Sequence, residues 1–266
     1  MSLSFQKIEN KTCSSLIKQA FIDTINKTMM KSWLRMTSVQ ENLQSIQQQI
    51  QEACNRSARK DSSVQLIAVT KSVSVERTRE VIDAGVFHLG ENRPEGLALK
   101  QEAITSEKVS WHYIGTLQTR KVKAVINQID YLHSLDRLSL AEEIEKRATA
   151  VINCFVQVNV AEEESKHGLA YAEVEEFIEQ LHPFTKINVI GLMTMAPLTE
   201  DEEMIRNVFR QLKELQAKIQ AKQYSYAPCS ELSMGMSGDF EIAIEEGATF
   251  VRIGTALVGQ DKEEDE

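Results

Sequence analysis

Short apolar runs alternate with amphipathic segments along most of this chain. The first amphipathic segment follows Ser38, which has capping-box spacing to Glu41, and it predicts a helix of about 20 residues. Its apolar positions fall on one helical face. They are Val39, Leu43, Ile46, Ile50 and Ala53.

Eight later runs have the length and apolar character of buried strands. They cover residues 64–69, 86–89, 111–114, 131–135, 154–160, 187–193, 231–234 and 250–253. Amphipathic segments lie between them, at 76–84, 120–128, 138–150, 172–181, 201–219 and 239–246. This alternation is typical of a parallel α/β protein, and eight strands are the number that closes a barrel.

No linker rich in Gly, Pro or Ser divides the series. We therefore predict one (β/α)8 TIM barrel over residues 38–259, with the N-terminal helix before its first strand. An open doubly wound sheet is the alternative, but Gly-x-Gly-x-x-Gly is absent after the first strand. Residues 1–37 are predicted to form an extension, helical or poorly ordered, and residues 260–266 an acidic tail.

The extension carries an apolar residue at every fourth position from Ile17 to Trp33. This stripe would dock on the barrel or on a partner. Alternatively, Met36 is a natural start and the preceding residues matter little, and this is the interpretation that we favour.

Composition and charge narrow the class of protein. The chain has 266 residues, 42% of them hydrophobic, a net charge of -9 and a pI near 5.3. The acidic balance argues against binding to nucleic acids or anionic membranes, and no apolar stretch approaches the ~18 residues of a membrane span. The four cysteines are scattered without metal-ligand spacing, as expected of thiols in a reducing cytosol. We expect a cytoplasmic monomer without a metal.

Polar residues follow each predicted strand, where a barrel builds its sites. Lys71 closes the first strand, beside low-dielectric surroundings in which an amine can become the nucleophile that carbonyl chemistry requires. A solvated strand terminator is the plainer interpretation of such a lysine. The remaining polar residues after strands are Glu91, Asn92, Gln118, Ser134, Asp136, Asn159, Thr194, Ser233, Ser237, Arg252 and Thr255.

The last two strands end in loops rich in glycine and hydroxyl groups, with Ser237 and Gly238 in one and Gly254 and Thr255 in the other. Backbone N–H groups in such loops bind phosphate. Arg252 lies among apolar residues, so it either reaches the mouth or pairs with a partner such as Asp239.

Two histidines within strands, His112 and His133, are expected to be hydrogen-bonded core residues. A lysine amine, a phosphate cradle and an apolar floor together suit an aldehyde cofactor that carries a phosphate, and pyridoxal 5′-phosphate (PLP) meets this description through a Schiff base.

The chain resembles the pyridoxal phosphate homeostasis proteins, single-domain barrels similar to the N-terminal domain of alanine racemase. The resemblance rests on motifs in the family's order. They are Ile67-Ala-Val-Thr-Lys71, Phe87-His-Leu-Gly-Glu-Asn92, the segment from His112 to Lys121, Val158-Asn-Val160, Ser165-Lys-His-Gly168, Gly191-Leu-Met-Thr-Met195, Leu232-Ser-Met-Gly-Met-Ser237 and Val251-Arg-Ile-Gly-Thr-Ala-Leu257. The chain departs from the family at Arg93-Pro94 and at Arg120.

The resemblance implies that Lys71 is the Schiff-base lysine and that Asn92 lies near the cofactor. Ser237, Gly254 and Thr255 would hold the phosphate, and Arg252 would approach the pyridine nitrogen or the phosphate. With Ser233, these residues make up the predicted cofactor site, and we predict no catalytic or metal-binding residue.

The resemblance implies a protein that holds PLP and delivers it, with PLP-dependent apo-enzymes as possible recipients. The alternative is a PLP-dependent amino-acid racemase or a related enzyme. A two-base racemase needs an opposing base from a second domain, and we expect none here, since the sequence stops seven residues after Gly259. A third interpretation is an aldolase that uses Lys71 without a cofactor.

Overall fold

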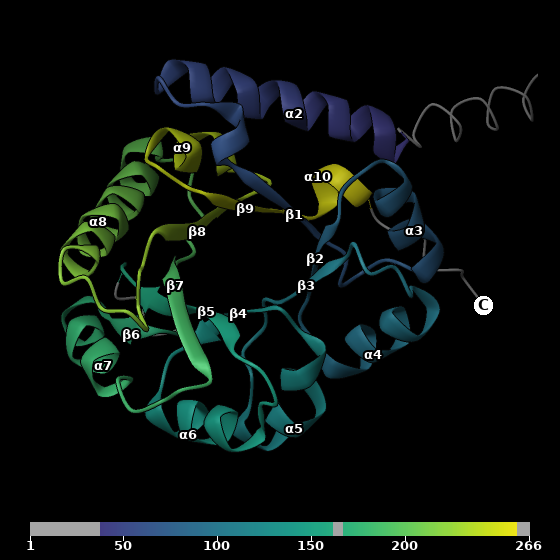
Figure 1. The fold of residues 1–266 in the computed structure, drawn as a ribbon. Coiled ribbons are helices and arrows are strands. Elements are labelled where there is room, and N and C mark those ends of the chain that lie inside the picture. The colour runs from purple at the N-terminus through teal and green to yellow at the C-terminus, as the bar shows by residue number, and fades with distance from the viewer. Residues whose placement is uncertain (1–37, 162–166, 260–266) are drawn as a thin grey trace, which may run out of the picture. The chain divides into compact units, whose positions relative to one another are not determined.

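The structure is a computed structural model that describes residues 38–161 and 167–259. Eight parallel strands close into a ring with helices outside it (Figure 1), because β4 pairs with β5 as well as with β3. The ring consists of β1 (Gln65–Val69), β2 (His88–Glu91), β3 (Ser110–Tyr113), β4 (Tyr131–Leu135), β5 (Ile152–Asn159), β7 (Ile187–Met193), β8 (Glu231–Met236) and β9 (Phe250–Ile253). The two-residue strand β6 (Leu169–Ala170) pairs with β5. The predicted (β/α)8 barrel is confirmed.

The helices include all those predicted, in the same order, and two that were not predicted, over 94–103 and 255–258. In chain order, the helices are α2 (Val39–Arg56), α3 (Val75–Asp83), α4 (Pro94–Ala103), α5 (Val122–Val125), α6 (Leu138–Arg147), α7 (Val174–Gln180), α8 (Glu202–Gln220), α9 (Phe240–Glu245) and α10 (Thr255–Val258). Helix α4 escaped the sequence pattern because its apolar residues do not gather on one face, so only Leu97 and Lys100 are buried. The helix predicted over 120–128 is one α-helical turn between two 3₁₀ turns.

Alternation along each strand gives the barrel two different cores. Residues such as Leu66 and Ala68 face outward and join a large apolar cluster with the helices. Inside the ring lies a second, smaller cluster of Ile67, Phe155, Met193 and Phe250. Histidines, an arginine and a serine share that interior, so the lumen is a packed but partly polar layer.

The N-terminal helix α2 is tied to the last part of the barrel. Arg56 on α2 forms ion pairs of 2.8 Å with Glu241 and 2.5 Å with Glu245 of α9. Asn42 donates to the carbonyl oxygen of Leu257 in α10 at 3.0 Å. These contacts join residues about 200 positions apart in the sequence. They hold α2 in the outer layer, beside β1 and β9 (Figure 1).

Several predictions fall on residues 1–37 and 260–266, which lie outside the described residues. The domain boundaries, the Ile17–Trp33 stripe and the acidic tail therefore stay predictions. Within 38–161 and 167–259, no helix combines the length and apolar character needed to span a bilayer. Cys54, Cys154 and Cys229 are buried free thiols.

Candidate functional site

The carboxyl end of β1 presents Lys71 at the mouth of the barrel. Lys71 is exposed, whereas the preceding residues Val69 and Thr70 are buried. A Cβ atom placed on Gly254 would lie 3.6 Å from the Cβ of Val69, in ordinary contact. The loop after β9 therefore packs against the end of the strand that carries Lys71, which brings two parts of the predicted site together.

Glu91 is not a mouth residue, contrary to the sequence prediction. Its side chain is 1% exposed and pairs with the equally enclosed Lys100 of α4, with 2.7 Å between Oε1 and Nζ. Thr70 donates its hydroxyl to the same carboxylate at 2.6 Å, and Lys100 also donates to the Thr70 carbonyl oxygen. Alternation turns Glu91 toward the helices rather than the lumen, so it fixes the backbone immediately before Lys71 instead of facing a ligand.

Asn92 lies at the end of β2, partly exposed, and the loop after β3 presses against it. A Cβ on Gly115 would come within 2.5 Å of the Asn92 carbonyl oxygen, so only glycine allows this approach. Ser134 donates to the Gly115 carbonyl oxygen at 2.7 Å, which uses its hydroxyl within the fold. Gln118 is exposed in the same loop, where its side-chain oxygen accepts from Arg120.

The two loops predicted to bind phosphate lie side by side. Ser237 and Gly238 lie near Ala256, because all three line one cavity of about 380 Å³ whose other walls come from α2, α8 and α9. Both Ser237 and Thr255 are exposed. Gly235 makes the turn possible, because its φ of +91° and the 2.6 Å between a Cβ there and the Cβ of Ala243 exclude larger residues. In α10 the N–H groups of Leu257 and Val258 donate to the Gly254 carbonyl oxygen, so Thr255 and Ala256 carry the backbone N–H groups that could serve a bound anion.

Arg252 is buried inside the barrel and bonds to β8 and to the end of β7, the two strands next to β9 along the ring. Its Nη1 donates to Ser233 Oγ at 2.6 Å and its Nη2 to the Thr194 carbonyl oxygen at 3.0 Å. Among the described residues it forms no ion pair with Asp239, so that alternative is wrong, although the carboxylate still opposes its loss of charge. Burial lowers the pKa of Arg252 to about 10, and the guanidinium remains a cation at neutral pH.

His112 and His133 are hydrogen-bonded core residues, as predicted. The structure adds His88, which precedes them in a line through the barrel interior and which the sequence analysis did not single out. The sequence could have indicated His88, because strand alternation places His88 and Gly90 at the inward positions of β2. The described residues contain no cluster of three or more His, Cys, Asp or Glu side chains placed to hold a metal ion.

The donor set fits a phosphorylated aldehyde. Lys71 is exposed two residues after Val69, against which the loop of Gly254 packs, and the hydroxyl groups of Ser237 and Thr255 are exposed nearby. Behind them, Ser233 and the Arg252 cation form a polar floor. The structure thus brings Lys71, Gly254, Thr255 and the Ser233–Arg252 pair to the carboxyl-terminal half of the barrel.

Comparison with known proteins decides the family. The profile of the alanine racemase N-terminal domain matches residues 42–262. The pyridoxal phosphate homeostasis protein of Aquifex aeolicus is 42% identical over 225 residues, which is 84% of this chain and 98% of the relative. The protein of that name from Escherichia coli is 32% identical, covering 84% and 97%. This chain belongs to the pyridoxal phosphate homeostasis protein family.

Solved structures agree with this membership. PipY of Synechococcus elongatus, solved with PLP bound, has a TM-score of 0.72 and 32% identity to this chain, covering 83% of it and all of PipY. An alanine racemase of Clostridium difficile has a TM-score of 0.67 at 15% identity, covering 86% of this chain and 58% of the racemase. The second likeness shows the shared barrel fold.

Proposed function

We propose that this protein binds PLP at the carboxyl-terminal mouth of its barrel, joined to Lys71 as a Schiff base, and supplies it without amino-acid turnover of its own. The observation that carries the proposal is the packing of the Gly254 loop against Val69, which places phosphate donors beside the end of β1, two residues before Lys71. The relatives named pyridoxal phosphate homeostasis proteins and the PLP-bound PipY support the same ligand.

Each residue of the site has a distinct task in this proposal. The aldehyde of PLP supplies an electrophilic carbon, to which the Lys71 amine bonds with loss of water. The Glu91–Lys100 pair holds the Thr70 backbone and so orients Lys71. Ser237, Gly254 and Thr255 provide hydroxyl and N–H donors for the phosphate. Asn92 borders the cofactor from β2.

Arg252 bears on whether the site turns over amino acids. PLP is a strong electron sink when a carboxylate keeps its pyridine nitrogen protonated. Arg252, fixed by Ser233 and the Thr194 carbonyl, would oppose that protonation by like-charge repulsion if it faces the ring. This argument favours a carrier, and the names of the relatives at 32–42% identity agree with it. A racemase-like enzyme is the alternative.

Reduction with borohydride tests the covalent bond. After incubation with PLP, we expect a stable adduct on Lys71, identified by mass spectrometry of peptides, and none in Lys71→Ala. Lys108→Ala is the matched control, because Lys108 lines a groove at the opposite, amino-terminal end of the barrel. An adduct on another lysine, or none after incubation with PLP, would contradict the proposal.

Incubation with L- and D-amino acids in deuterated water, followed by chiral analysis, tests the absence of turnover. We expect no appreciable racemisation. Rates of an ordinary enzyme, roughly 1–1000 per second, that disappear in Lys71→Ala would favour the racemase instead.

The remaining expectations belong to the same proposal. Three buried free thiols and a net charge of -9 support a protein of the reducing cytoplasm that avoids nucleic acids and anionic membranes. We infer that it acts as a monomer and passes PLP to apo-enzymes. Light scattering of the purified protein tests the first point, and transfer of PLP to an added apo-enzyme tests the second.

A further inference from the structure

A line of hydrogen bonds runs through the barrel interior from the amino-terminal end to Arg252. His88 Nδ1 lies 2.8 Å from His112 Nε2, and His112 Nδ1 lies 2.9 Å from His133 Nε2. His133 Nδ1 lies 2.9 Å from Ser233 Oγ, which accepts from Arg252. The first three residues stand on the adjacent strands β2, β3 and β4, whereas Ser233 stands on β8, across the lumen.

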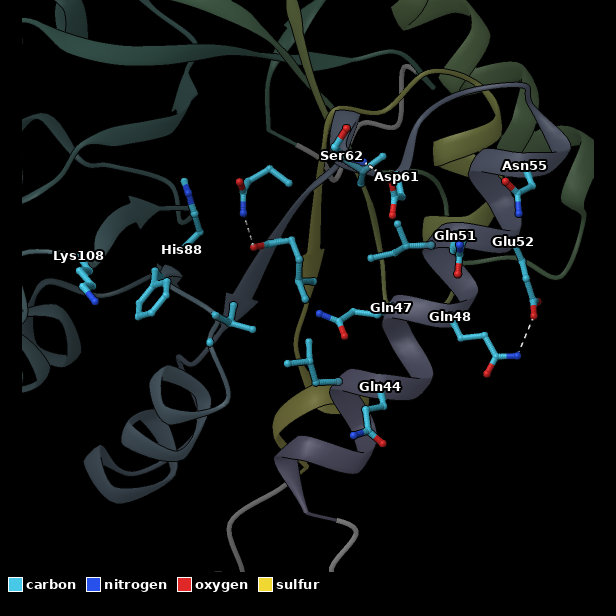
Figure 2. Close-up of a pocket in the computed structure, with 18 residues that line it drawn as sticks. Gln44, Gln47, Gln48, Gln51, Glu52, Asn55, Asp61, Ser62, His88 and Lys108 are labelled. Atoms are coloured by element: carbon cyan, nitrogen blue, oxygen red, sulfur yellow. Dashed lines mark hydrogen bonds between the residues drawn. The ribbon is translucent and has the colours of Figure 1, made fainter.

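The outer end of this line reaches solvent. Within the described residues, no buried side-chain nitrogen or oxygen lacks a hydrogen-bond partner. His88 Nε2 has no hydrogen-bond partner among the described residues, so this atom must be accessible to solvent rather than buried. His88 lines a groove of about 1140 Å³ between α2 and the amino-terminal ends of β1 and β2. Figure 2 shows His88 and Lys108 on the barrel side of the groove, with the glutamines of α2 on the other.

The inner rings are held in place. The ring of His112 stacks on Tyr131 with 4.3 Å between centroids and 4° between planes, and His133 stacks on Phe155 at 4.4 Å. His112 and His133 are both inaccessible to solvent. Burial and neighbouring positive groups hold the pKa of each well below its usual range, so both rings are neutral near pH 7. A neutral ring carries one N–H and one acceptor nitrogen.

These facts couple the rings to one another. In a line of neutral rings, each N–H must point at the acceptor nitrogen of the next, so the tautomer of one ring dictates that of its neighbours. In one arrangement Ser233 donates to His133 Nδ1, and every N–H points toward the groove. In the opposite arrangement His133 donates to Ser233, and the Ser233 hydroxyl turns its proton to another acceptor.

We propose that His88, His112, His133 and Ser233 form a proton relay that exchanges one proton between the groove at the amino-terminal end and the mouth of the barrel. A proton taken up at His88 Nε2 releases the Nδ1 proton of that ring to His112 Nε2. His112 then passes its Nδ1 proton to His133 Nε2, and His133 passes its own to Ser233 Oγ. Ser233 gives its former proton to an acceptor at the mouth, so one proton enters and one leaves.

The charged groups around His88 are few. Burial lowers the pKa of His88, and the carboxylate of Asp130, which accepts from the Trp111 N–H at 2.7 Å, offsets only part of that effect. Lys108 lines the same groove. The other neighbours are the rings of His112, Tyr131 and Phe250. A ring of lowered pKa that touches solvent can gain and lose a proton without holding it, as a relay terminus must.

The acceptor at the mouth rests on the proposed function: with PLP bound, it is a group of the ligand that Ser233 reaches. The relay itself belongs to the chain, so its test needs no cofactor. The full chain, with ¹⁵N-labelled histidines and no PLP, is examined by NMR. We expect His112 and His133 to be neutral and to share one tautomer, and the His133 ring proton to exchange with solvent.

His88→Gln is the decisive variant, because an amide can keep the hydrogen bond to His112 but does not relay a proton as imidazole does. We expect exchange of the His133 ring proton to slow by at least about tenfold, toward the rate of local opening. His88→Phe should act alike if it folds. The exposed His182, which packs on Tyr226, supplies the control His182→Gln, with no change expected. Different tautomers at His112 and His133, or unchanged exchange in His88→Gln, would overturn the relay.

Discussion

The two faces of the barrel sheet are built from different side chains. The outer face, which meets the helices, is almost entirely apolar and joins one large cluster. The inner face places only a few hydrophobic residues, such as Phe155 and Phe250, beside three histidines and a buried arginine. The helix layer therefore supplies most of the hydrophobic stabilisation, and the lumen can hold hydrogen-bonded groups that a site needs.

The largest expected effect concerns the buried Glu91–Lys100 ion pair, a polar contact on the otherwise apolar outer face. Lys100→Met leaves the Glu91 carboxylate buried without its cation, and the free energy of unfolding should fall by about 3–5 kcal/mol. Urea denaturation measures it. The double variant Glu91→Gln/Lys100→Met removes the unpaired charge, so it should recover part of the loss. Equal losses in both variants would show that packing, rather than charge, matters here.

Truncation on the outer face should cost nearly as much. Leu212 of α8 is completely buried in the outer cluster, and Leu212→Ala should lower the free energy of unfolding by about 2–5 kcal/mol. Because the change is remote from the lumen, the dissociation constant for PLP should stay the same. Titration of PLP fluorescence checks this, and weaker binding by the folded variant would refute the separation of the two faces.

The buried histidines of the inner face should make the stability of the protein depend on pH. The pKa of His112 and His133 lies well below the ordinary value in the folded chain, so only the unfolded chain takes up their protons as the pH falls below about 6.5. Stability is therefore lost toward acid, by up to about 1.4 kcal/mol per pH unit for each histidine.

Denaturation between about pH 7 and about pH 5 measures this slope. His112→Gln should lower the overall stability. It should also reduce the slope of stability against pH by the contribution of one histidine. His182→Gln, at an exposed position, is the control. A slope in His112→Gln equal to that of the unchanged protein would contradict the assignment of a neutral buried ring.

The smallest effect concerns a helix end on the outer layer. Asp201 caps α8 by accepting from the backbone N–H groups of Glu203 and Met204, each at 3.1 Å. Asp201→Ala should cost about 1 kcal/mol, and Asp201→Asn much less, since Asn also caps helices well. Thermal unfolding compares the two, and equal losses would show that the cap contributes little.

The sequence by itself determined the number and order of the barrel strands, most of the helices between them and the placement of Lys71 just after a strand. Those features follow from local periodicity, since apolar alternation and helical spacing are written into neighbouring residues. The same periodicity failed for α4, whose buried Lys100 reads as a surface residue until Glu91 is placed beside it.

Only the tertiary structure decided which polar groups meet. His133 and Ser233 are 100 residues apart in sequence and on strands that do not pair, yet they bond across the lumen at 2.9 Å. Periodicity tells which face of the sheet a side chain occupies, but not which residue lies opposite it. That partner depends on strand tilt, register and closure, and these belong to the whole ring rather than to any segment of the chain.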